Sequence, residues 1–188
     1  MTRLKLLLLA GALLFALVAP KSPFSLSRQP VTAPVRIAYG PAPGFDGIDP
    51  ELIGRAREKI DMAAYVLSDR KVIEALSAAA SRGVRIRLYL DPEQFRRIGG
   101  ASGEAAQALA HQPNVTAKVK TSNEDLMHLK AYAVDGHWLR SGSANFSWSG
   151  ETRQDNDIII IDSAEAAADF LARFETLWAR STNQEADR

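Results

Sequence analysis

The chain has 188 residues, no cysteine and a formal net charge of +1, with 46% hydrophobic and 24% charged residues. This composition is ordinary for a globular protein and excludes a collagen-like or wholly disordered chain. The lack of cysteine excludes disulfides, a thiol nucleophile and any cysteine-built metal centre. A charge near zero excludes a uniformly basic surface, so any attraction to a polyanion must come from a local patch.

The first twenty residues have the pattern of an export signal. Arg3 and Lys5 precede an apolar run from Leu6 to Ala19, which is shorter than the roughly 20 residues that a membrane span needs. We predict that residues 1–20 are a signal peptide or an N-terminal anchor, and that the protein is periplasmic or secreted. A buried helix is the alternative. Without these two bases the formal charge changes from +1 to −1.

The rest of the chain alternates strand and helix patterns, after a Pro- and Ser-rich segment at 21–34 that predicts a linker. Strand patterns, with alternating or continuous apolar residues, occur at 35–39, 62–67, 84–90, 115–119, 129–134, 137–141 and 157–161. Helix patterns, with apolar residues three and four apart, occur at 50–60, 70–82, 104–109 and 163–178.

This order of elements predicts one α/β domain over residues 35–180, followed by a polar tail at 181–188. The domain should contain a mixed β-sheet flanked by helices on both faces. The apolar run at 157–161 is typical of a central strand, and Asp91–Pro92 predicts a turn.

The chemically active side chains are concentrated between residues 128 and 147, which read HLKAYAVDGHWLRSGSANFS. His128 and Lys130 are two apart on a predicted strand, so both side chains leave the same face. This pair suits a phosphate, because lysine stabilises its oxygens while imidazole attacks phosphorus. Ser143 and Asn145, again two apart, add a hydroxyl and an amide donor.

A hairpin should bring these groups together. Asp135–Gly136 is a strong signal for a two-residue turn, in which Val134 pairs with His137. Continuing that register places Ser143 opposite His128. The local geometry therefore predicts that the two halves of the segment form one patch.

The segment resembles the HKD signature of the phospholipase D superfamily. The resemblance is carried by His128-x-Lys130-x4-Asp135 and by Gly142-Ser143-x-Asn145. The order of elements is also similar to that of the small single-motif members, which include bacterial endonucleases and mitochondrial phospholipase D-like nucleases. An α-β-α sandwich, with the motif on its hairpin, is the fold that this resemblance implies.

The resemblance also implies a role for each motif residue. His128 would be the nucleophile that forms a phosphohistidine intermediate. Lys130 and Asn145 would bind the substrate phosphate, and Ser143 would assist them. Asp135 belongs to the catalytic motif, although the role implied for it is more structural.

One further member of the family's site has no unique match. Members usually carry a Glu, often followed by Asn, that orients a catalytic histidine. Asp155 with Asn156 resembles that pair most closely, and Asp157 is a rival. Ungapped spacing would instead select Asn156. We expect Asp155 in this role because of its resemblance to the pair, with Asn156 and Asp157 as alternatives.

The chain holds only half of the site that this chemistry needs. A nucleophile acts on one side of phosphorus, and an acid protonates the leaving oxygen on the other. Besides His128 there are only His111, which reads as a solvated residue near a helix end, and His137. His137 is predicted roughly 20 Å from His128 along the hairpin. We therefore expect a homodimer that shares one site. The resemblance implies the same assembly, with no metal or other cofactor.

The predicted activity is that of a phosphodiesterase, and nucleic acid is the first candidate substrate. A nonspecific endonuclease on DNA or RNA is what the small exported relatives imply. A local basic groove for the backbone is predicted from Lys118, Lys120, Lys130, Arg140 and Arg153. A phospholipid headgroup ester is the alternative, since the chemistry is the same and the N-terminal segment would hold the domain at a membrane. A noncatalytic module that binds phosphate or nucleic acid is the second alternative.

Two tryptophans flank the motif. Trp138 and Trp148 have side chains suited to stacking on nucleic-acid bases. Burial in the core or in a dimer interface is the other interpretation of both residues.

Overall fold

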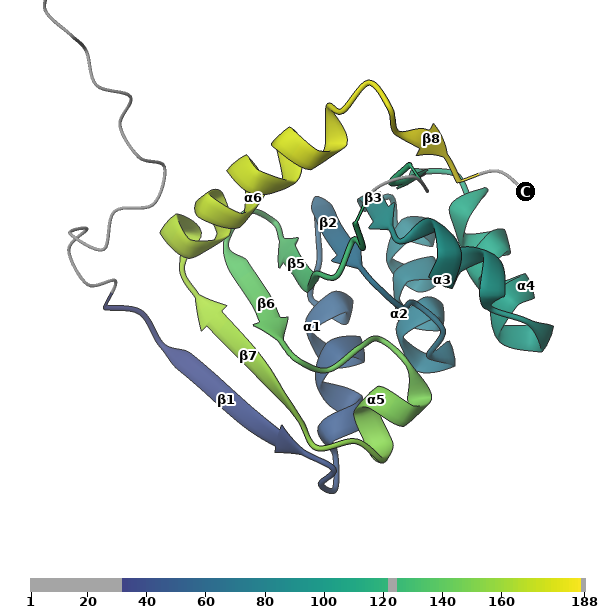
Figure 1. The fold of residues 1–188 in the computed structure, drawn as a ribbon. Coiled ribbons are helices and arrows are strands. Elements are labelled where there is room, and N and C mark those ends of the chain that lie inside the picture. Colours follow the sequence, from purple (N-terminus) through teal and green to yellow (C-terminus); the bar gives the residue numbers. More distant parts are fainter. Residues whose placement is uncertain (1–31, 122–124, 187–188) are drawn as a thin grey trace, which may run out of the picture. The chain divides into compact units, whose positions relative to one another are not determined.

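Eight strands form one mixed sheet in the order β1-β7-β6-β5-β2-β3-β4-β8 (Figure 1). The structure is a computed structural model that describes residues 32–121 and 125–186. β2, β3 and β4 run parallel to one another, and the other neighbours are antiparallel. The predicted signal segment and most of the predicted linker lie outside the described residues. No helix of the described part is long and apolar enough to cross a bilayer.

The strands are β1 (Val35–Gly40), β2 (Lys59–Ala64), β3 (Arg85–Leu90), β4 (Val115–Val119), β5 (Lys130–Val134), β6 (Trp138–Gly142), β7 (Asn156–Asp162) and β8 (Gln184–Glu185). The helices are α1 (Ile48–Gly54), preceded by a 3-10 turn at Phe45–Gly47, α2 (Arg70–Ser81), α3 (Pro92–Arg97), α4 (Gly100–Ala110), α5 (Trp148–Thr152) and α6 (Ala164–Trp178).

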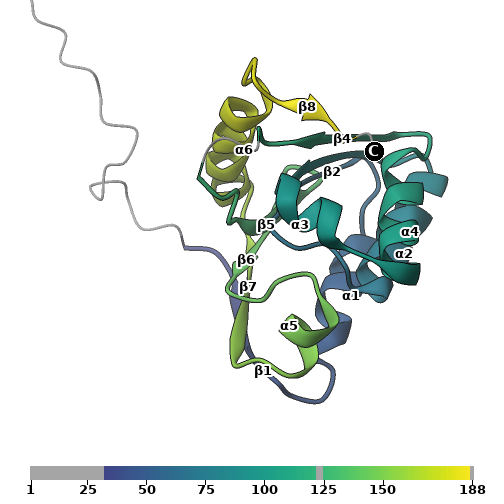
Figure 2. The ribbon, with the colours of Figure 1, turned by 45° about the vertical axis from the view of Figure 1, so that its right-hand side comes forward.

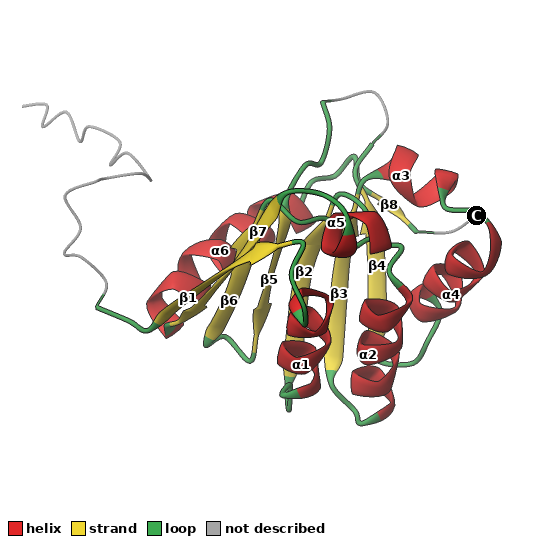
Figure 3. Ribbon diagram, turned by 90° about the horizontal axis from the view of Figure 1, so that it is seen from below, coloured by secondary structure: helices red, strands yellow, loops and turns green. Residues whose placement is uncertain are grey.

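Helices cover both faces of the sheet, which confirms the predicted α/β class. α1, α2 and α4 lie on one face and α6 lies on the other (Figure 2, Figure 3). Alternate residues of a strand point to opposite faces. Met62 of β2 accordingly packs in the core under α1 and α2, while Ala63 packs with Phe174 and Leu177 of α6. The two cores hold the sheet between two helical layers.

Several predicted elements have different bounds in the structure. α1 ends at Gly54, and Ile60 belongs to β2, because the alternation of Ile60, Met62 and Ala64 fits the sheet core better than a longer helix. Asp91 does not simply turn the chain. Its side chain accepts hydrogen bonds from the N–H groups of Glu93 and Gln94 and so caps α3.

The position of β7 in the sheet and the end of the domain also differ from the predictions. β7 is next to the edge strand β1 rather than central, and its Ile159 and Ile161 are only half-buried. The domain also extends beyond residue 180. Gln184–Glu185 pairs with β4, and Ala186 is buried in the core, so backbone pairing recruits the polar tail into the sheet.

The hairpin between β5 and β6 has a three-residue turn, so the predicted two-residue register is wrong by one. Val134 pairs with Trp138, and Asp135 takes a left-handed backbone conformation, with a φ of 53°. The Asp135 carboxylate accepts three backbone hydrogen bonds of 2.9 Å, from Arg57, Glu58 and Lys59. These long-range contacts fix the turn, and the altered register no longer places Ser143 opposite His128.

Asp135 therefore lies at the end of β5 that is remote from His128. Partial burial acts to raise the pKa of its carboxyl, but the three N–H donors outweigh it and hold that pKa below its usual value. The contacts support a structural role for Asp135 and not a direct catalytic one.

Replacing Asp135 should test this role. We expect Asp135→Ala to lower the free energy of unfolding at pH 7 by about 1.5–2 kcal/mol, because three N–H groups lose a charged acceptor. The stabilisation should be present above the ordinary aspartate pKa and be lost as pH falls through the lower folded-state pKa. Urea titrations measure it. Asp155→Ala, at an exposed position, is the control and should change stability by less than about 0.5 kcal/mol. Equal effects of the two variants would contradict the assignment.

Candidate active site

His128 and Lys130 lie together where the chain enters β5. His128 is exposed, and its ring centroid lies 4.5 Å from that of Tyr65, which directly follows β2. Lys130 donates a 2.8 Å hydrogen bond from Nζ to the His128 carbonyl oxygen, and Nζ lies 4.8 Å from the Tyr65 ring centroid. The Tyr65 ring thus contacts both the imidazole and the ammonium group.

The Lys130 side chain is largely shielded from solvent. The residue is only 8% exposed, and burial lowers the pKa of its side chain, as does the positive charge of Arg140. A poorly hydrated cation of this kind gains more from an anion than a solvated one does. The position therefore suits a lysine that binds phosphate.

Arg140 of β6 fastens the two halves of the motif. It is fully buried and forms a two-point ion pair with Asp49, with Nε–Oδ1 and Nη2–Oδ2 distances of 2.9 and 2.7 Å. Its Nη1 donates to the carbonyl oxygens of Lys130 and Ala144, at 2.9 and 3.2 Å. His128 precedes the first of these carbonyls, and Asn145 follows the second. One guanidinium group therefore sets the spacing between the two segments.

The second half of the motif is organised around Asp157. Ser143 donates a 2.6 Å hydrogen bond from Oγ to Asp157 Oδ1 and accepts one of 2.9 Å from the Asp157 N–H. Gly142 has a φ of 137°, and a Cβ there would lie 2.4 Å from the Asp157 carbonyl oxygen, so only glycine fits. Asn145 is half-buried, and its Oδ1 has no hydrogen-bond partner among the described residues.

The three candidates for the orienting acid lie in different surroundings. Asp155 is exposed and forms no hydrogen bond with the part of the chain that the structure describes. Asn156 donates from Nδ2 to the Gly150 carbonyl oxygen at 2.9 Å. Only Asp157 contacts a motif residue, Ser143.

The other two histidines lie away from His128. His137 pairs with Asp162 at 2.5 Å, at the far end of β6. His111 ends α4 just before β4 begins, whereas His128 lies at the end of the sheet where the parallel strands finish. All three histidines of the sequence are within the described residues, so this chain alone places one imidazole at the motif. Within those residues, no group of three or more His, Asp or Glu side chains is arranged to hold a metal.

The predicted basic groove is largely wrong. Arg140 is buried against Asp49, and Lys120 is 8% exposed and donates to the Asp125 carbonyl oxygen. Lys118 is directed to α6, with Nζ 4.8 Å from the Trp178 ring centroid. Of the five cations, Lys130 and the exposed Arg153 remain near the motif.

Glu151 of α5 is a buried acid that the sequence did not single out. It is 1% exposed, and neither carboxyl oxygen has a hydrogen-bond partner among the described residues. Burial, followed by the negative charges of Asp49 and Asp69, raises the pKa of Glu151 to about 9, against an opposing effect of Arg140. The carboxyl is therefore protonated at neutral pH. In sequence it looks like an ordinary acid in the first turn of a helix.

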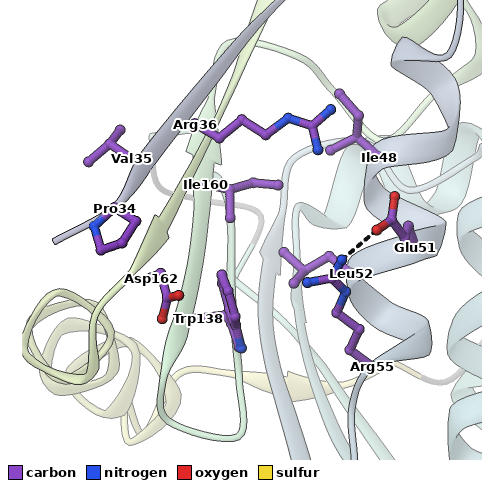
Figure 4. A pocket seen from close by; sticks show the side chains of 10 residues that line it. All are labelled: Pro34, Val35, Arg36, Ile48, Glu51, Leu52, Arg55, Trp138, Ile160 and Asp162. Carbon is purple, nitrogen blue, oxygen red and sulfur yellow. Dashed lines mark hydrogen bonds and ion pairs between the residues drawn. The ribbon is translucent and has the colours of Figure 1, made fainter.

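A partly open hollow elsewhere in the domain is separate from the motif. It has a volume of about 210 Å³ and lies between α1 and strands β1, β6 and β7 (Figure 4). Trp138 lines it, with the Arg55 guanidinium 5.8 Å from the indole centroid. Since Trp138 and His128 are at opposite ends of the hairpin, stacking of a base on Trp138 beside the motif is ruled out.

Comparison with known proteins agrees with the motif. The sequence profile of the family described as "Cardiolipin synthase, PLD-like domain" matches residues 50–178. A Rickettsia bellii protein named phospholipase D is 27% identical over 159 residues, which cover 83% of this chain and 73% of the relative. A Xenopus tropicalis mitochondrial cardiolipin hydrolase is 27% identical over 158 residues, covering 80% and 70%.

Solved structures agree with the fold. The phospholipase D family member Nuc from Salmonella typhimurium superimposes with a TM-score of 0.70 and 25% identity, over 81% of this chain and 97% of Nuc. NucT from Helicobacter pylori superimposes with a TM-score of 0.66 at 18% identity, over 81% and 99%. The chain therefore belongs to the phospholipase D superfamily. It is a hydrolase of that superfamily, a nuclease or a phospholipase D.

The pairing of Arg140 with Asp49 can be tested by stability. Arg140→Met leaves a buried carboxylate unpaired, and we expect the free energy of unfolding to fall by about 3–5 kcal/mol. Arg55→Met breaks an exposed pair with Glu51 and should cost less than about 1 kcal/mol. Denaturant titrations of both variants give the comparison. Similar losses from the two substitutions would contradict the central position given to Arg140.

The buried acid predicts an unusual pH dependence. Between the ordinary glutamate pKa and about 9, the folded state holds a proton on Glu151 that the unfolded chain releases. Stability should therefore fall as pH rises through this window, by up to about 1.4 kcal/mol per pH unit. Glu151→Gln should flatten the profile and be more stable than the parent at pH 8. Thermal melting from pH 5 to 9 tests this, and parallel profiles would contradict a protonated Glu151.

Proposed function

We propose that the protein is a metal-independent phosphodiesterase that acts on nucleic acid through a phosphohistidine on His128. The observation that carries the proposal is an exposed imidazole beside the poorly hydrated Lys130 ammonium group. The Arg140 guanidinium donates hydrogen bonds to the carbonyl oxygens of Lys130 and Ala144. It therefore holds the segment that contains Asn145 next to the segment that contains His128. Lysine and amide groups then supply the positive potential that a metal ion supplies in other phosphodiesterases.

The reaction has two displacements. A ring nitrogen of His128 forms a bond to phosphorus as the bond from phosphorus to the leaving oxygen breaks, and a second imidazole gives that oxygen a proton. The same imidazole then takes a proton from water, which attacks phosphorus and releases His128. Because one chain brings a single histidine to the motif, His128 of a second copy is the candidate for this acid and base.

An apolar strip supports a homodimer with a shared site. Val35, Ile37 and Tyr39 lie on one face of the edge strand β1 and are 54%, 50% and 73% exposed. They continue onto half-buried Ile159 and Ile161 of β7. Tyr39 pairs with Asp157, the partner of Ser143, so the strip ends at the motif. A second copy that covers this strip would bury exposed apolar area beside the site.

Asp157 is the acid that the contacts favour for positioning. It binds both the hydroxyl and the N–H of Ser143, whereas Asp155 points to solvent. We propose that Asp157 rather than Asp155 is the acid that orients a catalytic histidine.

We further propose that residues 1–20 direct the protein out of the cytoplasm.

A phospholipid headgroup ester is the second candidate substrate. Leu126 and Leu129, on either side of His128, are 55% and 39% exposed. Apolar side chains at the edge of a site suit contact with a bilayer. Two of the similar proteins are named phospholipase D and cardiolipin hydrolase, names that indicate a lipid substrate for those proteins.

The substrate can be identified in one set of assays. The full chain would be incubated with excess EDTA and with single-stranded DNA, RNA, plasmid or phosphatidylcholine vesicles. We expect cleavage of nucleic acid, and loss of at least about a hundredfold in rate with His128→Ala. His111→Ala, at a remote helix end, is the control and should retain full rate.

Three results would contradict the proposal. Choline release without cleavage of DNA or RNA would establish the lipid alternative. Binding of phosphate or nucleic acid without any turnover would favour the noncatalytic alternative. Activity that disappears with EDTA and returns with a divalent cation would exclude the metal-independent route.

A further inference from the structure

A shallow hollow of about 410 Å³ opens beside the motif, between α3, the start of α4 and α5. Four serine side chains, Gln94, Arg97 and Trp148 contribute most of its lining. Gln94 donates a 3.1 Å hydrogen bond from Nε2 to the Tyr65 hydroxyl, and the Tyr65 ring packs against His128. The hollow is therefore two side-chain contacts from the nucleophile.

The opposite wall of the hollow is rigidly attached to the motif. α5 begins three residues after Asn145, and Ser147 caps it by accepting a hydrogen bond from the Gly150 N–H. The Phe146 carbonyl oxygen between them accepts from the N–H groups of Ser68 and Asp69, at 2.8 and 3.0 Å. These bonds fix the position of the first α5 residue, Trp148, relative to the phosphate-binding segment.

Trp148 is unusual for its surroundings. The residue is 59% exposed, in a hollow whose lining includes serine, glutamine and arginine side chains, so it does not serve the core. The Arg153 guanidinium lies 5.6 Å from the indole centroid. An exposed indole with cations nearby is the arrangement with which proteins stack nucleic-acid bases and hold the backbone.

We propose that this hollow is a nucleoside subsite, in which the base next to the scissile phosphate stacks on Trp148. Arg97 would bind the adjoining phosphate. Its present partner is Glu93, at 2.7 Å in an exposed ion pair of the kind that exchanges readily. An acyl chain fits less well, because it would strip water from the serines, Gln94 and Arg97 without replacing their hydrogen bonds. This inference rests on the proposed nuclease function and narrows its substrate to unstacked, single-stranded segments.

The test compares a missing base with a missing indole. Labelled single-stranded oligonucleotides, either intact or with one abasic position next to the cleaved bond, would be titrated into the full chain carrying His128→Ala. Base stacking predicts that the intact strand binds roughly 5- to 150-fold more tightly than the abasic strand. Trp148→Ala should remove this preference, Trp148→Phe should retain part of it, and Arg97→Ala should weaken both strands alike. Arg55→Ala, which breaks a similar helical ion pair at a remote site, is the control and should change neither affinity.

The outcomes separate the subsite from the function. If the parent chain cleaves DNA or RNA but Trp148→Ala keeps the preference for the intact strand, the subsite is wrong and the nuclease proposal stands. If the chain binds neither strand and hydrolyses phosphatidylcholine vesicles instead, both are wrong, and a loss of vesicle binding in Trp148→Ala would make the indole a membrane contact. If Trp148→Ala only shifts a dimer to monomers in sedimentation, the indole belongs to an interface and the subsite is again overturned.

Discussion

A single buried guanidinium group determines the geometry of this site. Arg140 has no exposed surface, and all three of its nitrogens donate hydrogen bonds, to Asp49 and to the carbonyl oxygens of Lys130 and Ala144. Removing such a pair from water is costly, so the contacts must be well formed for the fold to tolerate them. The benefit is that two chain segments ten or more residues apart keep a fixed spacing before any substrate arrives. Preorganisation of this kind is what phosphoryl chemistry requires of a protein.

Two ionisable groups near that pair, Lys130 and Glu151, have pKa values shifted in opposite directions. Lys130 is a partly buried cation whose pKa is lowered, and Glu151 is a buried acid whose pKa is raised. A neutral Glu151 avoids a further negative charge near Asp49 and close to the segment that would hold phosphate. The cost is an acid without a hydrogen-bond partner among the described residues. Groups with shifted pKa values are common at catalytic sites.

Local patterns predicted much of the fold, and distant contacts account for the errors. The alternation of β3 and β4 and the apolar face of α2 are properties of neighbouring residues, and the structure contains all three elements. The hairpin register depends on Asp135 and backbone N–H groups more than seventy residues earlier, which no local pattern reveals. The same reason applies to β8, since its pairing with β4 depends on where α6 returns the chain.

The motif itself was visible in the sequence, but its supports were not. The spacing of His128, Lys130 and Asn145 pointed to phosphate chemistry without any structure. Arg140 read as a surface cation, because nothing in the sequence pairs it with Asp49, ninety-one residues away in the chain. A buried charged residue such as Arg140 can be told from a surface one only when the structure shows its partner. The substrate hollow around Trp148 is likewise assembled from three separate segments.

The central claim is that two copies of His128 form one catalytic site. Co-expression of the active chain with about a ninefold excess of the His128→Ala chain tests it directly, because most active chains then sit in mixed dimers. A shared site predicts that the rate per active chain falls to about a tenth, since only dimers with two intact histidines turn over. A rate per active chain that is unchanged by dilution, with mixed dimers verified by sedimentation, would show a self-contained site and contradict the account.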